Sequence, residues 1–245
     1  ETAEILEANA ADIAAARDRL IVALDVPTVP EAEALVARLG DTVTFYKVGL
    51  ELVMNGGMAL VAALKDQGRQ VFLDVKFLDI DTTVEKATAN AARSGADFLT
   101  VHATDSKTLK AAARGAAGSQ LRVLGVTVLT SLDGADLAEQ GISSAPADLV
   151  VHRAKLAHAA GCHGVIASGH EAASVRQAIA ERSFAIVTPG IRLPSDDVGD
   201  QARVTTPETA IGTGATHVVV GRPITQAPDP KAAAELFVER IAAAS

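Results

Sequence analysis

Short runs of apolar, often β-branched residues alternate along this chain with longer Ala-rich stretches whose apolar residues recur at helical spacing. The two patterns predict strands and helices respectively. Most of the helical stretches end in Gly, the residue favoured just past a helix C-terminus. The expected strands cover 19–26, 44–50, 71–76, 97–103, 121–129, 164–168, 184–190 and 217–222. The expected helices include 30–40, 57–68, 82–95, 146–161, 170–181 and 207–214.

This alternation indicates a parallel sheet, because near-continuous apolar strands are typical of sheets covered by helices. Eight strand–helix units without a Pro/Ser-rich linker favour an α/β fold of one closed (β/α)8 TIM barrel. We expect residues 1–245 to form a single domain with a helical extension at about 1–18. The alternative is a doubly wound open sheet, but its usual glycine-rich nucleotide motifs do not occur here.

Composition narrows the classes of partner. The chain has 245 residues, 49% of them hydrophobic, and a net charge of −8. An acidic balance argues against nucleic acid or an anionic membrane as the main partner, yet it permits a local basic pocket for a small anion. The single Cys162 cannot form an internal disulfide, and no apolar run reaches the ~18–20 residues of a membrane span. We therefore expect a cytoplasmic protein.

Charged residues stand where several expected strands end, which is the end of a TIM barrel that carries chemistry. Asp25 and Lys47 end the first two strands, and Asp74 and Lys76 lie two apart in the third, so both should face the barrel interior. An isolated pair of this kind could be a structural ion pair, but four alternating charges at one mouth favour a site. Further polar residues follow four other strands: His102, Thr130 with Ser131, Arg192, and Arg222.

Several motifs carry a resemblance to a known family. They are LDVP at 24–27, YKVGLEL at 46–52, FLDVKFLDI at 72–80, LTS at 129–131, TPGIR at 188–192, GDQAR at 199–203 and VGRPIT at 220–225. With these motifs the sequence resembles the orotidine 5'-monophosphate decarboxylases over nearly the whole chain from about Arg19. The D-x-K-x-x-D element alone is less specific, because related barrel enzymes that act on sugar phosphates share it.

The resemblance implies decarboxylation of orotidine 5'-monophosphate to UMP and CO2 in pyrimidine biosynthesis, without a cofactor or metal. It assigns Lys76 as the proton donor to C6 of the pyrimidine and places Asp74 near the substrate carboxylate. Lys47 and Asp25 would contact ribose hydroxyls and complete the charge array.

The resemblance also implies a homodimer, in which Asp79 and Thr83 reach into the neighbouring subunit's site. Thr130 corresponds to the position that meets the pyrimidine amide edge. The phosphate grip would consist of Arg192, Gln201, Gly221 and Arg222. Residues 192–203 form a long polar loop, which we interpret as a lid over the phosphate.

The implied chemistry is physically reasonable. Loss of CO2 from C6 leaves a carbanion outside the ring π system, so the protein must supply preorganised positive charge at that carbon. Repulsion of the substrate carboxylate by Asp74 is too weak to suffice. Two charges ~4 Å apart interact by about 4 kcal/mol at an effective dielectric near 20, whereas difficult reactions need up to ~23 kcal/mol.

Some positions depart from the family or leave alternatives open. Many relatives have Pro where this chain has Asp81, which we interpret as the N-cap of the following helix. We interpret His102 as a structural rim histidine.

The enzyme alternative is a Mg²⁺-dependent sugar-phosphate decarboxylase or aldolase of the same superfamily. A non-catalytic phosphosugar sensor is the alternative outside the enzymes.

Overall fold

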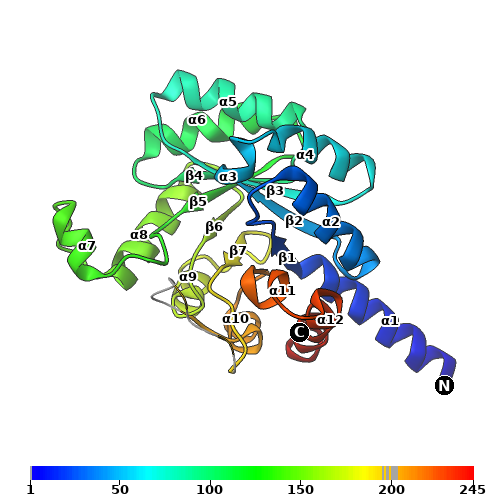
Figure 1. Ribbon diagram of the computed structural model, residues 1–245. Helices are drawn as coiled ribbons and strands as arrows, with labels where there is room; N and C mark the ends of the chain where they lie inside the picture. Colours follow the sequence, from blue (N-terminus) through cyan, green and yellow to red (C-terminus); the bar gives the residue numbers. More distant parts are fainter. Residues whose placement is uncertain (1, 195, 197–198, 200–203) are drawn as a thin grey trace.

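The chain forms a closed barrel of eight parallel strands, as predicted (Figure 1). The computed structural model describes residues 2–194, 196, 199 and 204–245. The strands follow one another around the barrel in chain order. They are β1 (Leu20–Ala23), β2 (Phe45–Gly49), β3 (Gln70–Phe77), β4 (Phe98–His102), β5 (Arg122–Val126), β6 (Gly164–Ile166), β7 (Ala185–Thr188) and β8 (His217–Val220).

The first and last strands close the sheet. β1 pairs in parallel with β2, where Val22 lies opposite Tyr46, and also with β8, where Ile21 lies opposite Val219. Every strand, including the first and the last, therefore has a neighbour on both sides, and the sheet has no free edge. The open doubly wound alternative is therefore wrong.

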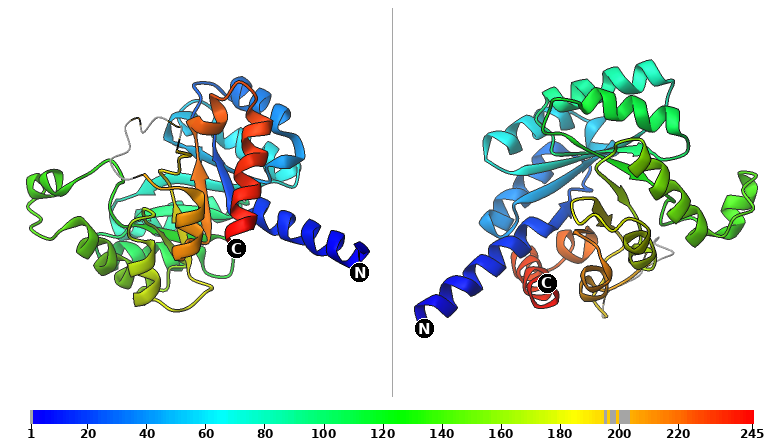
Figure 2. Two further views of the ribbon diagram at one scale, coloured as in Figure 1. Left: turned by 90° about the horizontal axis from the view of Figure 1, so that it is seen from below. Right: turned by 180° about the vertical axis from the view of Figure 1, so that it is seen from behind.

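Helices surround the barrel in one outer layer (Figures 1 and 2). In α2, for example, Thr28 caps the N-terminus by accepting a hydrogen bond from the Glu31 backbone N–H at 3.3 Å. The longer helices are α2 (Val29–Leu39), α4 (Gly57–Asp66), α5 (Asp81–Arg93), α6 (Ser106–Ala116), α8 (Pro146–Ala159), α9 (Ala172–Ala178), α10 (Pro207–Thr213) and α12 (Pro230–Ala244). The short ones are η1 (Gly40–Thr42), α3 (Leu50–Val53), α7 (Gly134–Glu139) and α11 (Arg222–Thr225).

Two helical segments stand out from this layer (Figure 2). Helix α1 (Thr2–Arg19) precedes β1, contacts α12 and points away from the barrel. Helix α7 projects from the long connection between β5 and α8. The assignment of residues 1–245 to one domain with an extension at about 1–18 stays a prediction.

Apolar side chains fill two separate regions. The larger lies between the sheet and the helices, and the smaller lies inside the barrel. The interior residues alternate along each strand with those that face the helices, as the side-chain period of a strand requires. The interior cluster consists of Ile21, Ala23, Phe45, Phe72, Phe98, Leu124, Ala185, Val187 and Val219.

Toward the carboxyl ends of β2, β3 and β4 the interior becomes polar. Lys47, Asp74 and Thr100 each lie two residues after an interior Phe. The same alternation that builds the apolar floor of the barrel therefore delivers polar groups to its mouth.

Strand β3 is irregular where its charged residues lie. The register between β3 and β4 shifts between Leu73 and Phe77. Lys76 has φ +49°, the one positive φ of a non-glycine residue in the described ranges. Strict alternation, which we expected to place Asp74 and Lys76 on one face, therefore does not hold through Lys76.

The helix after β3 begins one residue earlier than expected, at Asp81 rather than at Thr82. Its N-cap is Ile80, which makes no side-chain capping bond, and Asp81 is the first helical residue. The Asp81 carboxylate accepts a hydrogen bond from the Thr82 backbone N–H at 3.0 Å. Our prediction of Asp81 as N-cap is wrong, although its negative charge still lies in the first turn, where the helix dipole favours it.

Candidate active site

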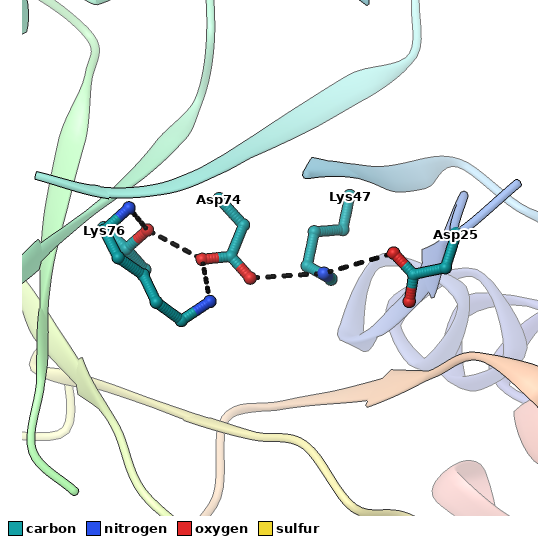
Figure 3. A network of polar contacts seen from close by, with 5 residues as sticks. Asp25, Lys47, Asp74 and Lys76 are labelled. Carbon is teal, nitrogen blue, oxygen red and sulfur yellow. Dashed lines mark hydrogen bonds and ion pairs between the residues drawn. The ribbon is translucent and has the colours of Figure 1, made fainter. Parts of the chain in front are cut away.

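Four side chains of alternating charge form a chain across the mouth of the barrel (Figure 3). The Lys47 ammonium lies 3.7 Å from Asp25 Oδ1 and 3.2 Å from Asp74 Oδ2. The Lys76 ammonium lies 2.8 Å from Asp74 Oδ1. The structure thus brings together the four residues that the sequence analysis placed at the ends of β1, β2 and β3.

The centre of this chain is buried and its ends are more open. Exposed fractions are 9% for the Asp74 side chain and 14% for Lys47, against 31% for Lys76 and 60% for Asp25. Burial penalises both central ions, since it removes them from water. Each central ion therefore depends on the opposite charges beside it.

Opposite charges outweigh that penalty at both central positions. Burial alone would raise the pKa of Asp74, but the Lys47 and Lys76 ammoniums hold this pKa below its ordinary value. Burial alone would lower the pKa of Lys47, but Asp74 and Asp25 raise it above its ordinary value. Asp74 and Lys47 are consequently both charged at neutral pH.

A cavity of about 160 Å³ adjoins the charge chain. Lys47, Asp74 and Lys76 line one part of it, and Thr130 from the β5 connection lines another. Apolar side chains form most of the remaining wall: Phe72, Val126, Val128, Leu129, Ile166, Pro189 and Val219. The cavity can therefore hold a flat, largely apolar ring with its polar edge near Thr130 and a reacting atom near the ammonium.

The residues expected to grip a phosphate lie on the connections after β7 and β8. Arg222, directly after Gly221, is exposed and borders a second cavity of about 200 Å³. Gly199 lies against it, since a Cβ on Gly199 would stand 2.8 Å from Arg222 Cζ. Gly221 lies beside Asp25, because a Cβ there would be 3.8 Å from Asp25 Oδ2.

Arg192 occupies a different environment from Arg222. It is buried, with 8% exposure, and its Nη1 donates to the Ile191 carbonyl at 2.9 Å. Among the described residues, it does not line the cavity beside Arg222. Gln201, the remaining expected phosphate contact, lies outside the described residues.

Asp79 and Thr83 stand apart from the charge chain of their own subunit. Both are exposed. The Asp79 carboxylate accepts a hydrogen bond from the Ile80 backbone N–H at 2.7 Å. In the ranges that the structure covers, no ion pair joins Asp79 to Lys76.

Comparison with known proteins supports the interpretation of this geometry. Residues 18–237 match the orotidine 5'-phosphate decarboxylase / HUMPS family. The chain belongs to this family. The predicted fold and the predicted resemblance are both confirmed, and the expectation of a decarboxylase of pyrimidine biosynthesis is confirmed at the level of the family.

Relatives of this family are similar along nearly their whole length. A protein of Bradyrhizobium sp. strain BTAi1 named orotidine 5'-phosphate decarboxylase is 54% identical, with 94% of each chain covered. One of the same name from Rhodopseudomonas palustris strain BisA53 is 49% identical, with 94% of this chain and 97% of that one covered. The crystal structure of orotidine 5'-phosphate decarboxylase from Lactobacillus acidophilus has a TM-score of 0.80 at 38% identity, covering 91% of this chain and 98% of that one.

Further polar residues surround the family's charged motif in this chain. His102 ends β4, where burial first and then the positive charges of Lys76 and Arg153 lower its pKa, so the imidazole is neutral at neutral pH. Ser131 is exposed, in contrast to Thr130 in the cavity wall.

Among the described residues, no helix is both long and apolar enough to cross a membrane.

The sequence analysis missed Thr100, which lies in β4 beside the charge chain. Its hydroxyl donates to Asp74 Oδ1 at 2.8 Å and accepts from the Lys76 backbone N–H at 3.0 Å. The available signal was period-two spacing: Phe98, Thr100 and His102 share one face of an otherwise apolar strand.

Proposed function

We propose that this chain decarboxylates orotidine 5'-phosphate to UMP and CO2, with Lys76 delivering a proton to C6 of the pyrimidine. The alternating charge chain of Asp25, Lys47, Asp74 and Lys76 at the mouth of the barrel carries the proposal. Membership of a family whose relatives bear the name orotidine 5'-phosphate decarboxylase supplies the substrate.

The two oxygens of Asp74 divide the work of holding the two ammoniums. Oδ2 faces Lys47 at 3.2 Å, and Oδ1 accepts from Lys76 at 2.8 Å. Lys76 is thereby held at the border of the cavity, with further N–H donors left for a substrate. As CO2 leaves, negative charge develops at C6 beside a fixed ammonium, which stabilises the carbanion and then protonates it.

Binding energy comes from the two ends of the nucleotide. The apolar wall formed by residues such as Ile166 and Val219 packs against the ring, while Thr130 meets its amide edge. Asp25 and Lys47 meet the ribose. Arg222 and the Gly221 backbone hold the phosphate, for which a guanidinium offers two parallel hydrogen bonds. The proposed grip also includes Arg192, which is buried and does not line the cavity beside Arg222, and Gln201, which lies outside the described residues. That residues 192–203 act as a lid over the phosphate stays a prediction.

A direct assay tests the activity. Loss of orotidine 5'-phosphate absorbance is followed for the wild type, for Lys76→Ala, and for Lys231→Ala, which changes an exposed lysine on α12. We expect kcat to fall by roughly 10⁴-fold or more in Lys76→Ala, because both charge stabilisation and the proton donor are lost. Lys231→Ala should match the wild type. Circular dichroism confirms that each variant is folded, and a wild type without turnover would refute the proposal.

The Mg²⁺-dependent sugar-phosphate alternative makes a separate prediction for the same assay. Turnover of orotidine 5'-phosphate that survives exhaustive chelation supports the proposed cofactor-free reaction. Loss of turnover on chelation, restored by Mg²⁺, would favour the alternative. Binding of UMP without any turnover would instead favour a phosphosugar sensor.

We also propose that two copies of the chain form a dimer through the rim beside the charge chain. Large apolar side chains are exposed on the connections that follow the neighbouring strands β2 and β3, and exposed apolar patches mark interaction sites. Asp79 lies in the sequence between two of these side chains, Leu78 and Ile80. The exposed fractions are 55% for Leu50, 84% for Met54, 42% for Met58, 58% for Leu78 and 68% for Ile80. Burial of this patch against a second copy would carry Asp79 and Thr83 toward the partner's site.

Mixing inactive variants tests the shared site. In a dimer of Lys76→Ala and Asp79→Ala chains, one site receives an intact Lys76 from one chain and an intact Asp79 from the other. Random exchange of equal amounts makes half of the dimers mixed, so about a quarter of wild-type activity should return. As a control, Lys76→Ala mixed with Asp74→Ala should restore nothing, because both residues serve the site of their own chain.

No activity in the first mixture, with subunit exchange verified by mass, would contradict a role for Asp79 in the adjacent site. The decarboxylase proposal would survive that result, since it depends on Lys76 and Asp74. The cytoplasmic location expected from the sequence stays a prediction.

A further inference from the structure

Thr100 closes a ring of hydrogen bonds that begins and ends on Lys76. The Lys76 backbone N–H donates to Thr100 Oγ1 at 3.0 Å, and that hydroxyl donates to Asp74 Oδ1 at 2.8 Å. The same Oδ1 accepts from the Lys76 ammonium at 2.8 Å. Thr100 is fully buried, so water does not compete for its hydroxyl.

The ring spans the irregular part of β3. β3 and β4 pair at Leu73 with Leu99 and next at Phe77 with Val101, so β3 advances by four residues while β4 advances by two. A bulge of this kind re-aims side chains and leaves backbone groups without their ladder partners. The Lys76 N–H is such a group, and the Thr100 hydroxyl takes the place of a strand carbonyl.

Lys76 also has a backbone conformation that needs outside support. Its φ of +49° lies in the left-handed region, which side-chain-bearing residues rarely adopt. Strained residues persist only where neighbouring contacts fix them, and they concentrate at functional sites. The contact from Thr100 Oγ1 acts directly on this residue's own N–H.

We propose that Thr100 is a positioning residue for the proton donor. Its hydroxyl holds the left-handed turn at Lys76 with one hydrogen bond and orients the carboxylate that holds the Lys76 ammonium with the other. The proposal deepens the proposed function and rests on it, because it concerns delivery of the same proton to the same substrate.

The chemistry of a hydroxyl group makes the two bonds interdependent. Thr100 has a single O–H proton, and Asp74 Oδ1 in its ionised form can only accept, so Thr100 must use its lone pair for the Lys76 N–H. Serine preserves both bonds. Valine has nearly the shape of threonine and preserves neither, so comparison of the two separates hydrogen bonding from packing.

The test compares Thr100→Val, Thr100→Ser and a matched control in decarboxylation of orotidine 5'-phosphate. The control is Thr88→Val, which removes an equally buried hydroxyl that has no hydrogen-bond partner among the described residues. We expect kcat to fall by about 100-fold in Thr100→Val, the loss that a misplacement of about 1 Å can cause. KM should change much less, because Arg222 and the apolar wall are intact. Thr100→Ser should keep most of kcat, and Thr88→Val all of it.

The pH profile adds a readout that packing alone would not move. A hydrogen bond to an ionised carboxylate lowers its pKa, so loss of the Thr100 hydroxyl raises the pKa of Asp74 toward its ordinary value. The acidic limb of the kcat profile should therefore move to higher pH in Thr100→Val and stay in place in Thr100→Ser.

Several outcomes would overturn the role of Thr100. An unchanged kcat in Thr100→Val would be one. Equal losses of kcat in Thr100→Ser and Thr100→Val would be another, because packing would then be the cause. If Thr100→Val does not fold, Thr100→Cys replaces it. Because a thiol forms weaker hydrogen bonds, kcat of Thr100→Cys should lie below that of Thr100→Ser but above one hundredth of the wild-type value. An unchanged kcat in Thr100→Cys would again refute the role.

A measurement without turnover separates this proposal from the function on which it rests. Amide hydrogen exchange at Lys76 should be faster in Thr100→Val than in wild type and Thr100→Ser, because the N–H loses its acceptor. A wild type that does not decarboxylate orotidine 5'-phosphate would sink the proposed function. If the wild type is active but amide exchange at Lys76 is the same in Thr100→Val as in the wild type, only the inference about Thr100 is refuted.

Discussion

The two ends of this barrel treat buried ionisable groups in opposite ways. At the carboxyl end, Asp74 and Lys47 stay charged because each lies next to groups of opposite charge. At the amino end, His217 is neutral: burial first, and then the positive charges of Arg122 and Arg19, lower its pKa to about 3. The sign of the neighbouring charges, added to similar burial, decides whether an ion persists.

The amino end is built around aromatic rings rather than ion pairs. The His217 ring meets Phe98 at 5.1 Å and Phe45 at 5.9 Å between centroids, both edge to face. Arg122 lies over the Phe98 ring at 5.3 Å. A recess of about 680 Å³ opens at this end, larger than the cavity of about 160 Å³ beside Lys76. Size alone would select the wrong end. Among the described residues that line the larger recess, His158 and Glu181 form one exposed pair at 3.3 Å but no alternating chain of charges.

Among the changes that test this contrast, Asp74→Asn should have the largest effect on the free energy of unfolding. The change removes the shared partner of Lys47 and Lys76, leaving Lys47 with Asp25 at 3.7 Å. Loss of one member of a buried ion pair costs about 3–5 kcal/mol, so urea unfolding should show a decrease of that order in the free energy of unfolding. A variant as stable as the wild type would show that the charges at this end do not depend on pairing.

A surface pair is the matched control for this change. Asp41 lies 3.4 Å from Arg69, but its side chain is fully exposed. Exposed ion pairs contribute little, because water and salt screen them. Asp41→Asn should therefore change the free energy of unfolding far less than Asp74→Asn. Equal effects would mean that burial does not set the importance of these pairs.

Sequence patterns predicted much of the carboxyl end. Apolar runs at regular intervals located all eight strands, and period-two spacing with parallel topology was enough to bring Lys47 and Asp74 together. Most expected strands were longer than the observed ones, as for 121–129 against Arg122–Val126, whereas β3 (Gln70–Phe77) was longer than the expected 71–76. Strand ends depend on where ladder pairing stops, which is a property of the neighbouring strand.

The details that the sequence could not reveal depend on contacts between strands. The left-handed conformation of Lys76 follows from the register of β3 against β4. Thr100 is 24 residues from Lys76 along the chain, so local spacing gives no sign that they bond. Asp81 was placed one position from its observed role because Ile80, without a capping side chain, serves as N-cap.

The neutral imidazole at the amino end makes stability sensitive to acid. Below the ordinary histidine pKa of about 6.5, the unfolded chain binds a proton at His217 that the folded chain does not bind until about pH 3. The free energy of unfolding should therefore fall as the pH falls from 6.5 toward 3. The contribution of this one group to the slope is at most about 1.4 kcal/mol per pH unit.

His217→Gln should make this slope shallower, because glutamine does not titrate. Urea unfolding from pH 7 to pH 4.5 measures the slope for the wild type and the variant, and their difference isolates His217 from the carboxylates and from His102 and His163. His152→Gln, which changes an exposed histidine on α8, is the control and should keep the wild-type slope. Identical slopes in the wild type and His217→Gln would mean that His217 takes up its proton in the folded barrel, and the contrast between the two ends would then fail.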